Sequence, residues 1–440
     1  MAIRDFHWAV AAAGLALCVA GPADARKKPP PPPPPAPVIP QVKSGDSAID
    51  AFYYYDRSGA PIWLRDEAGR QAAAKLAEIL DRAPIDGLSE GPTLAGSVRT
   101  AIAGGTLSDD AAISIAWLKF VRALKAPVNG IHYGDAALAL SPPSAKPALS
   151  DLLAAPSMLV HVSQVAAVNP LYSALREQAL KDGSAADPRV RATLDRLRLL
   201  PAKGRAILVD VASAQLWMME NGQPIDSMKV VVGKTGSPTP LLAGTVHYVT
   251  FNPYWHILDE VARRKVAPLV IKRGVKYLKA AKYDTVTSWS DPEPVDPTSI
   301  DWKAVAAGDE HVFIRQKPGV NNMMGAMKFS FANDFDIFLH DTPHRELFAK
   351  DRRTLSLGCI RLEHADRLAQ WLLGRDAAPP TDAPEQHVQI DRGVPVYVTY
   401  LTANVADGQM AFANDVYGLD PVPEAPAETA IASASAAKPQ

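Results

Sequence analysis

The sequence predicts an α+β protein in which a helical half precedes a mostly-β half. Up to about residue 195, several segments repeat apolar residues at helical spacing. After Gly204 the pattern changes to β-rich runs that flank Asn221-Gly222, a dipeptide typical of tight hairpins. A segment of different composition, from about residue 255 to 305, interrupts those runs. We expect it to be a helical insert in the second half.

The chain begins with a pattern typical of an export signal. Arg4 precedes the apolar run Ala9–Ala20, and Ala23-Asp24-Ala25 provides an A-x-A cleavage site. The run is shorter than the ~20 residues of a membrane span, so we expect residues 1–25 to be a cleaved signal peptide. A lipoprotein signal using Cys18 is the alternative, but Leu17 stands where such signals have a small residue.

Both ends of the mature chain have biased composition. Residues 26–46 contain seven consecutive prolines, Pro29–Pro35, which favour a stiff polyproline II spacer. The alternative is that these prolines bind a proline-recognition domain. Residues 421–440 are mostly Ala, Pro, Ser and Glu, which predicts a disordered tail.

The remainder is long enough for two or three domains. The whole chain is 48% hydrophobic and 21% charged, with a formal net charge of −1. This balance gives no case for a nucleic acid partner. No later run reaches the ~20 apolar residues of a membrane span, so none is expected. The sequence does not indicate an oligomeric state.

Residues 47–200 are expected to form a helical scaffold domain. The clearest helical repeats are Gln71–Ala83, Ala111–Lys125 and Leu171–Gly183, the last with a glycine that stops the helix. These segments carry no cluster of His, Cys or paired carboxylates. We therefore expect this half to pack and support rather than to react.

Residues 204–420 are expected to form a mostly-β catalytic domain. The first predicted strands flank Asn221-Gly222, and further ones follow at Thr245–Phe251, Val312–Arg315, Phe335–Leu339 and Val394–Leu401. The run Phe335–Leu339 leads directly into His340. A histidine at a strand end is held rigidly, which suits a catalytic base.

The insert is strongly basic over part of its length. Residues 263–282 contain eight basic residues and no acidic one, namely Arg263, Arg264, Lys265, Lys272, Arg273, Lys276, Lys279 and Lys282. Such a run is often only the solvated face of helices. The alternative is a flap that helps to hold an anionic, carboxylate-rich substrate. The sequence leaves both interpretations open.

Cys359 is the one thiol left after signal cleavage, because Cys18 is the only other cysteine. An exported protein rarely keeps an unpaired thiol, so reactivity is the favoured reason for it. His340 is the candidate base, and Asp341 or a backbone carbonyl could fix its tautomer. The amides of Gly358 and Cys359 could face a developing oxyanion. Together these residues indicate acyl transfer through a thioester.

Three other interpretations of this stretch are open. Cys359 could be a buried structural residue. A metal site could use His340, Asp341, His344 and Cys359, but Pro343 prevents the helix that would align the two histidines. Redox chemistry would need a second cysteine. We therefore expect neither a metal nor a cofactor.

At these residues the chain resembles a known family. His340-Asp341-Thr342-Pro343, followed by Ser356-Leu357-Gly358-Cys359-Ile360-Arg361, resembles the signature of YkuD-type L,D-transpeptidases. That signature is a histidine, a spacer, and then [S/T]-x-G-C-[I/V]-R. Other stretches resemble the larger periplasmic members, which carry a helical scaffold and a substrate-capping insert: Gly233–Pro240, Phe251–Trp255, Gln316–Phe331 and Asp415–Asp420.

The resemblance implies a reaction on peptidoglycan in the periplasm. By analogy, Cys359 attacks the carbonyl of the third residue of a tetrapeptide stem, usually meso-diaminopimelate, and releases D-alanine. A side-chain amine of a second stem then resolves the thioester and cross-links the wall. His340 would act as base and then as acid. An L,D-carboxypeptidase with water as acceptor, or a catalytically silent wall-binding scaffold, remain alternatives.

The resemblance also suggests residues that contact substrate, namely Arg361, Ser356 and Trp255. Arg361 could instead pair with an acidic neighbour, and Ser356 could simply shape the loop. The chain departs from the family in two respects. Leu357 stands where many members have a second histidine, and the stretch from Gly183 to Pro201 is too short for a peptidoglycan-binding module.

Overall fold

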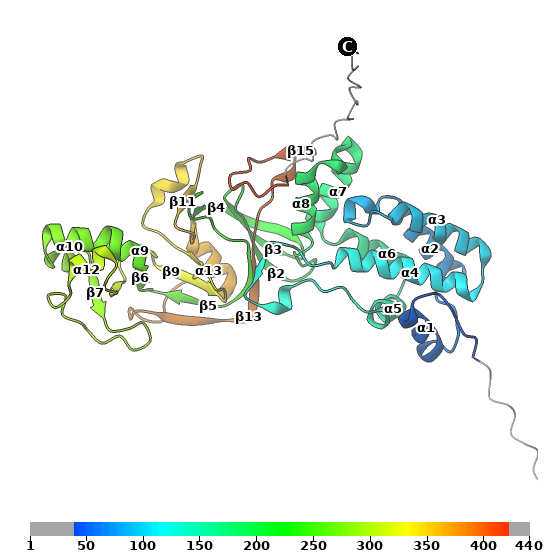
Figure 1. Ribbon diagram of the computed structural model, residues 1–440, viewed down its shortest axis with the longest axis horizontal. Helices are drawn as coiled ribbons and strands as arrows, with labels where there is room; N and C mark the ends of the chain where they lie inside the picture. The colour runs from blue at the N-terminus through cyan, green and yellow to red at the C-terminus, as the bar shows by residue number, and fades with distance from the viewer. Residues whose placement is uncertain (1–38, 422–440) are drawn as a thin grey trace, which may run out of the picture. The chain divides into compact units, whose positions relative to one another are not determined.

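The computed structural model of the protein describes residues 39–421 (Figure 1). The predicted signal peptide, the prolines Pro29–Pro35 and nearly all of the predicted tail lie outside the described residues. Within residues 39–421, no helix combines the length and apolar character needed to cross a membrane.

The first half is helical, as predicted, except for the short strand β1 His132–Tyr133, which pairs with β5 Leu242–Phe251 of the second half. The helices Gln71–Ala83, Ala111–Lys125 and Leu171–Gly183 are confirmed as α2, α4 and α7. The α-helices are α1 Ser47–Ala51, α2 Glu67–Asp81, α3 Gly91–Gly104, α4 Leu107–Leu124, α5 Ala145–Ala154, α6 Met158–Ala167, α7 Pro170–Asp182 and α8 Pro188–Leu197. Local chemistry sets their ends. A capping box between Thr106 and Asp109 starts α4, and Gly183 ends α7 with a φ of 82°.

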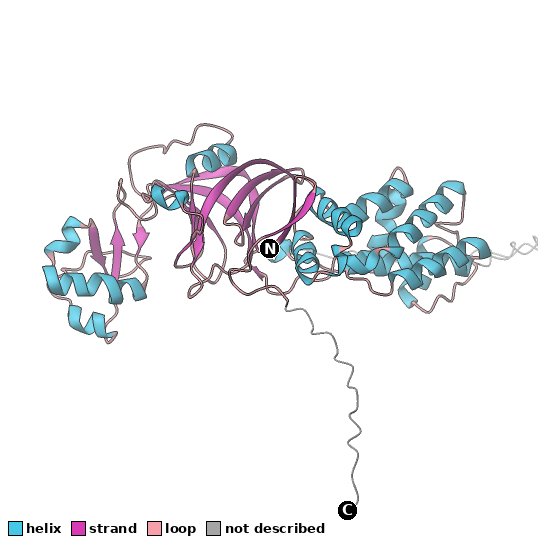
Figure 2. Ribbon diagram, turned by 90° about the horizontal axis from the view of Figure 1, so that it is seen from above, coloured by secondary structure: helices cyan, strands magenta, loops and turns pink. Residues whose placement is uncertain are grey.

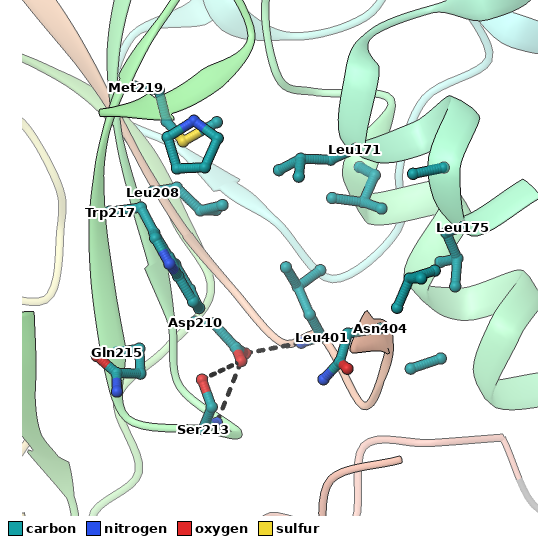
Figure 3. Close-up of a pocket in the computed structure, with 15 residues that line it drawn as sticks. Leu171, Leu175, Leu208, Asp210, Ser213, Gln215, Trp217, Met219, Leu401 and Asn404 are labelled. Carbon is teal, nitrogen blue, oxygen red and sulfur yellow. Dashed lines mark hydrogen bonds between the residues drawn. The ribbon is translucent and has the colours of Figure 1, made fainter. Parts of the chain in front are cut away.

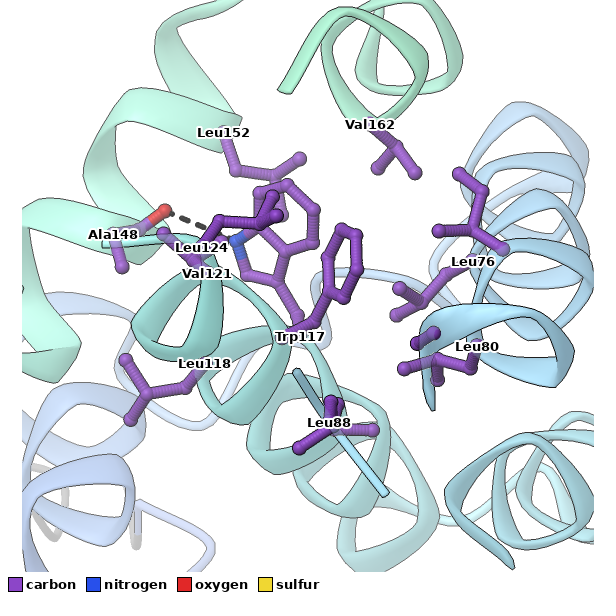
Figure 4. Close-up of a cluster of buried hydrophobic side chains, with 14 of the residues drawn as sticks. Leu76, Leu80, Leu88, Trp117, Leu118, Val121, Leu124, Ala148, Leu152 and Val162 are labelled. Atoms are coloured by element: carbon purple, nitrogen blue, oxygen red, sulfur yellow. Dashed lines mark hydrogen bonds between the residues drawn. The ribbon is translucent and has the colours of Figure 1, made fainter. Parts of the chain in front are cut away.

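The helices pack around large aromatic side chains. Trp117 of α4 is buried among residues of α2, α5 and α6, and its indole N–H donates to the Ala148 carbonyl at 3.3 Å (Figure 4). Its ring meets the Trp63 ring edge-on, with centroids 6.3 Å apart. Burial of such rings makes this core a stable platform.

The second half is built on one strongly curved sheet (Figure 2). Its strand order is β1-β5-β13-β2-β3-β4-β12-β10-β9, with β11 paired to β4 and β9 also paired to β5. The β5–β9 pairing joins the two ends, so the strands from β5 to β9 form a closed ring without a free edge between them. The strands are β1 His132–Tyr133, β2 Arg205–Asp210, β3 Gln215–Glu220, β4 Gln223–Gly233, β5 Leu242–Phe251, β9 Met327–Phe331, β10 Phe338–His340, β11 Thr354–Ser356, β12 Ile360–Leu362 and β13 Gln386–Thr399.

Two strand predictions change in detail. The Asn221-Gly222 hairpin is confirmed, with both residues at positive φ between β3 and β4. The strand predicted at Phe335–Leu339 begins only at Phe338, because Asn333 Oδ1 accepts the amides of Phe335 and Ile337 and folds a turn there. His340 is therefore the last residue of β10 rather than the residue after it.

The insert is helical only in part. It contains helices α9 Asp259–Val261, α10 Ala267–Arg273, α11 Lys276–Ala280 and α12 Trp302–Ala307, and a three-stranded sheet of β6 Trp255–His256, β7 Tyr283–Val286 and β8 Phe313–Gln316. The strand predicted at Val312–Arg315 forms as β8, but it pairs with β6 and β7 rather than with the large sheet. Ile314 and Val312 are buried in the insert's own core, which explains this placement.

A mainly apolar cavity of about 390 Å³ lies where α7 and α8 face β2 and β3 (Figure 3). Leu171, Leu175 and Trp217 line it, and the buried carboxylate of Asp210 closes one end. Asp210 accepts the amides of Leu401 and Ser213, so it is a structural tie. None of the residues that line this cavity belongs to the cysteine–histidine stretch.

Candidate active site

Two neighbouring parallel strands bring the candidate nucleophile and base together. In the β10–β12 pair, Leu339 is opposite Ile360 and His340 is opposite Arg361. Leu339 and Ile360 are fully buried in the core of the sheet. Because side chains alternate along a strand, His340 and Arg361 project to the other face. Cys359 lies in the loop immediately before β12, where it packs partly against the core of the sheet, and the charge of Arg361 acts on both its thiol and the imidazole of His340.

His340 is held in one tautomer by the main chain. Its side chain is buried, and Nδ1 lies 2.6 Å from the carbonyl oxygen of Asp341. A carbonyl only accepts, so Nδ1 carries the proton and Nε2 keeps its lone pair. Burial, assisted by the charge of Arg361, lowers the pKa of His340 to about 3. At neutral pH the imidazole is therefore a neutral base.

Asp341 orients His340 through its carbonyl, and its carboxylate has another task. That carboxylate accepts the Ala326 amide at 2.8 Å and forms an ion pair with Arg345. A side chain at Gly325 would collide with it, since an added Cβ would lie 2.3 Å from Oδ2. The Asp341 carboxylate thus fastens the loop before β9 beside the base. Of the two orienting groups expected from the sequence, the structure shows the backbone carbonyl.

The Cys359 thiol is half-buried, and Sγ lies 3.5 Å from the carbonyl oxygen of Asp336. Burial raises the pKa of Cys359, while the Phe338 amide and the cations Arg361 and Lys328 act against that rise. The thiol is therefore protonated at neutral pH. Among the hydrogen bonds of residues 39–421, none joins Cys359 directly to His340. The resting pair is a neutral thiol and a neutral imidazole.

Ser356 shapes the loop that carries the thiol. Its hydroxyl donates to the Cys359 carbonyl at 2.6 Å and accepts the Gly358 amide at 3.1 Å. The Gly358 carbonyl in turn accepts from Thr239 Oγ1 at 2.7 Å. The Gly358 amide is thus engaged by Ser356, contrary to the expectation that it faces an oxyanion. The amide of Cys359 remains as the candidate donor.

Two cations share the face of the thiol. Arg361 is half-buried, its Nε has no hydrogen-bond partner, and no carboxylate of the described chain lies within 4 Å of its guanidinium. Lys328 of β9 is opposite His340, and its Nζ lies 5.0 Å from the centre of the Phe338 ring. Lys328 likewise forms no ion pair within residues 39–421. Glu346 is an acidic neighbour whose charge acts on Arg361, but it does not form an ion pair with it within 4 Å in the described chain.

Sequence reasoning missed Lys328, although a signal was present. In β9 the buried Met327, Phe329 and Phe331 alternate with Lys328 and Ser330. That alternation places Lys328 on the face away from the core. Only the pairing of β9 with β10 brings it beside His340, and the sequence does not reveal this pairing.

The other predicted site residues lie elsewhere. Trp255 belongs to β6 of the insert, where its ring packs 6.5 Å from that of Tyr283. Leu357 is 42% exposed and points to solvent. His344 forms a hydrogen bond with Glu346 at 3.1 Å, outside any cluster of three or more metal-ligating side chains within residues 39–421.

A cavity of about 420 Å³ is lined by Asp341, the residue after the base, but not by His340 or Cys359. Asn252, Gly325, Asp341, Thr342 and Arg345 are among the residues that line it. It is large enough for part of a peptide. The arrangement as a whole offers a thiol, a neutral base, two unpaired cations and an adjacent cavity.

Comparison with known proteins assigns two parts of the chain to domain families. Residues 204–398 match the L,D-transpeptidase catalytic domain family YkuD, and residues 48–178 match a scaffold domain family. The chain carries a YkuD L,D-transpeptidase catalytic domain behind a scaffold domain. The fold class predicted from the sequence is therefore confirmed.

A curated relative bears the same family name. The Haemophilus influenzae protein "Putative L,D-transpeptidase" is 29% identical over 235 residues, which cover 51% of this chain and 46% of the relative. The matched segment thus spans about half the length of the relative.

Similar solved structures are distant. An L,D-transpeptidase from Mycobacterium smegmatis is 14% identical with a TM-score of 0.22, and the match covers 44% of this chain and 59% of that one. An L,D-transpeptidase from Stackebrandtia nassauensis is 13% identical with a TM-score of 0.20, over 55% and 78% of the two chains. These scores are too low to carry a structural argument.

Proposed function

We propose that this chain is an exported peptidoglycan L,D-transpeptidase that acts through a thioester on Cys359. The observation that carries the proposal is a neutral, singly oriented imidazole at the end of β10 and a thiol directly before β12, the parallel strand paired with it. A nucleophile with a nearby base is the arrangement that acyl transfer needs. Membership of the YkuD family supports the same reaction.

In the first half-reaction, Cys359 Sγ attacks the carbonyl carbon of the third residue of a donor tetrapeptide stem. The thiol proton passes to Nε2 of His340 as the C–S bond forms. The amide of Cys359 stabilises the negative oxygen of the tetrahedral intermediate. The C–N bond to the terminal D-alanine then breaks, and His340 returns the proton to the leaving amine.

In the second half-reaction, the side-chain amine of an acceptor stem attacks the thioester. His340 removes a proton from that amine, the C–S bond breaks, and the thiol of Cys359 is regenerated. The product is a cross-link between two third residues. The carbonyl of Asp341 keeps the imidazole in the same tautomer through both halves, because His340 Nδ1 donates to it throughout.

Arg361 and Lys328 are proposed to bind a carboxylate of the donor stem. A half-buried guanidinium without an ion pair is costly unless a ligand supplies the missing anion. Both cations also favour the thiolate over the thiol.

The test is the product of purified protein incubated with tetrapeptide-stem muropeptides, analysed by mass spectrometry. We expect a cross-linked dimer and free D-alanine from the wild type and neither from Cys359→Ala. Free D-alanine without dimer would indicate an L,D-carboxypeptidase. Absence of both products, with retained binding to sacculi, would indicate a silent wall-binding scaffold and overturn the proposal.

A further inference from the structure

The basic insert contains a cleft that is separate from the cysteine–histidine site. The cleft has a volume of about 650 Å³ and is bounded by α11, β7, β8 and the segments at 294–297 and 317–318. Four cationic side chains line it, Lys279, Lys282, Arg315 and Lys317, against the single carboxylate of Asp284. The other six basic residues in the stretch 263–282 are not part of this lining.

The cations of the cleft are mostly unpaired. Lys317 forms an ion pair with Asp284 at 3.1 Å. In the described part of the chain, no carboxylate lies within 4 Å of Lys279, Lys282 or Arg315. The Arg315 guanidinium stacks on the Tyr254 ring at 4.1 Å, and its Nε is buried without a partner. The cleft therefore has an excess of positive charge that the protein does not neutralise.

Backbone geometry holds one of these cations in place. Lys282 has a φ of 57°, an uncommon conformation for a residue with a side chain. The carbonyl of Lys282 accepts a hydrogen bond from the Lys317 amide at 2.9 Å. Its Nζ lies close to Gly319, because a Cβ added to Gly319 would be 3.3 Å from that Nζ. This pairing of residues 282 and 317 joins the cleft wall to the loop that leads to β9.

That loop connects the cleft with the base. The buried Asn322 donates to the carbonyls of Lys317 and Pro253, and the Ala326 amide donates to Asp341 Oδ2. Asp341 orients His340. A ligand in the cleft would thus contact the same ordered loop that supports the catalytic histidine.

We infer that this cleft is a second binding site for a carboxylate-bearing peptide strand. This inference rests on the proposed function in one respect, that the substrate is a polymer with repeated peptide carboxylates. The lining mixes cations with aliphatic and proline side chains such as Leu278, Val295 and Pro318, as suits a peptide better than a bare anion. The cleft would hold a neighbouring stem while Cys359 acts on another.

The test measures binding to sacculi in the Cys359→Ala background. A failure of the proposed catalysis is therefore distinguishable from a failure of binding in the cleft. Co-sedimentation with purified sacculi compares Lys279→Gln/Lys282→Gln with the matched pair Lys272→Gln/Lys276→Gln. The matched pair removes the same charge from exposed positions outside the cleft. We expect the dissociation constant to rise about tenfold for the cleft pair and less than about twofold for the matched pair.

A third variant, Lys279→Arg/Lys282→Arg, should retain binding because it keeps both charges. If both Gln pairs weaken binding equally, sacculi respond to general surface charge and the inference is wrong. It is also wrong if neither pair weakens binding. A soluble disaccharide tetrapeptide should displace the protein from sacculi, whereas inorganic phosphate at the same ionic strength should not. Equal displacement by phosphate would contradict a peptide carboxylate as the ligand.

Discussion

Two sites, one in each half of the molecule, treat charge in opposite ways. In the helical half, the fully buried carboxylate of Asp110 accepts the amides of Ile62, Trp63 and Leu64 and the hydroxyl of Tyr53. On the catalytic face, Arg361 and Lys328 lie beside the thiol without a carboxylate partner in the described chain.

The difference separates structural from functional charge. A buried carboxylate with every acceptor site used fixes the segments that donate to it, and its cost is offset within the fold. Half-buried cations without an anion destabilise the free protein, so a ligand is the expected source of compensation. The Asp110 site is satisfied within the fold, whereas Arg361 and Lys328 are proposed to be neutralised by substrate.

The largest effect is expected from breaking the satisfied network. Asp110→Ala leaves three backbone amides buried without acceptors, which should lower the free energy of unfolding by about 4 kcal/mol. Urea denaturation followed by circular dichroism measures it. The neighbouring Asp109→Ala removes only an exposed capping interaction and should cost about 1 kcal/mol. Similar losses for both would contradict the role given to Asp110.

A second effect concerns pH and His340. In the unfolded chain this histidine binds a proton below about pH 6.5, whereas in the fold its pKa is lowered to about 3. The unfolded state therefore holds more protons in that window, and stability falls as pH falls through it, by up to about 1.4 kcal/mol per pH unit. His340→Gln should flatten this slope in denaturation series from pH 7 to 4. An unchanged slope would contradict a buried neutral imidazole.

The unpaired cations should affect activity rather than stability. Arg361→Gln and Lys328→Gln should each raise KM about tenfold, equivalent to about 1.4 kcal/mol of binding. Their unfolding midpoints should stay the same or rise, because an uncompensated charge has been removed. A stem peptide whose third-residue carboxylate is amidated should lose this sensitivity. If the two substitutions raise KM as much with the amidated peptide as with the free carboxylate, the cations do not bind that carboxylate.

The smallest effect is expected at Leu357. Its side chain is 42% exposed and contributes little to the core. Leu357→Ala should change the free energy of unfolding by less than about 0.5 kcal/mol and leave dimer formation near the wild-type rate. A large fall in rate without loss of stability would show that this position contacts the substrate despite lacking a histidine.

Much of this arrangement could be predicted from local patterns. The three strongest helical repeats and the Asn221-Gly222 hairpin are confirmed, because helical spacing and turn chemistry are local properties of sequence. The stretch with His340 and Cys359 also pointed to one reaction. Local reasoning did not place β8, whose partners β6 and β7 both lie within the insert rather than in the large sheet.

The rest depended on pairing between distant segments. Lys328 becomes part of the site only because β9 joins β10, and the engagement of the Gly358 amide depends on the rotamer of Ser356. The sequence left open whether the carboxylate of Asp341 or a backbone carbonyl orients His340. The structure decides for the Asp341 carbonyl, because the carboxylate is engaged by the Ala326 amide and by Arg345. Register and side-chain orientation at this level are not encoded in short-range periodicity.

The most direct test of the account is the mass of the intact protein after rapid mixing with a tetrapeptide stem. The account predicts a transient covalent adduct of stem minus D-alanine, mapped to Cys359 after digestion, and its absence in Cys359→Ala. His340→Gln should form the same adduct far more slowly. An adduct on another residue, or product formed at the wild-type rate without Cys359, would contradict the thiol as the centre of the chemistry.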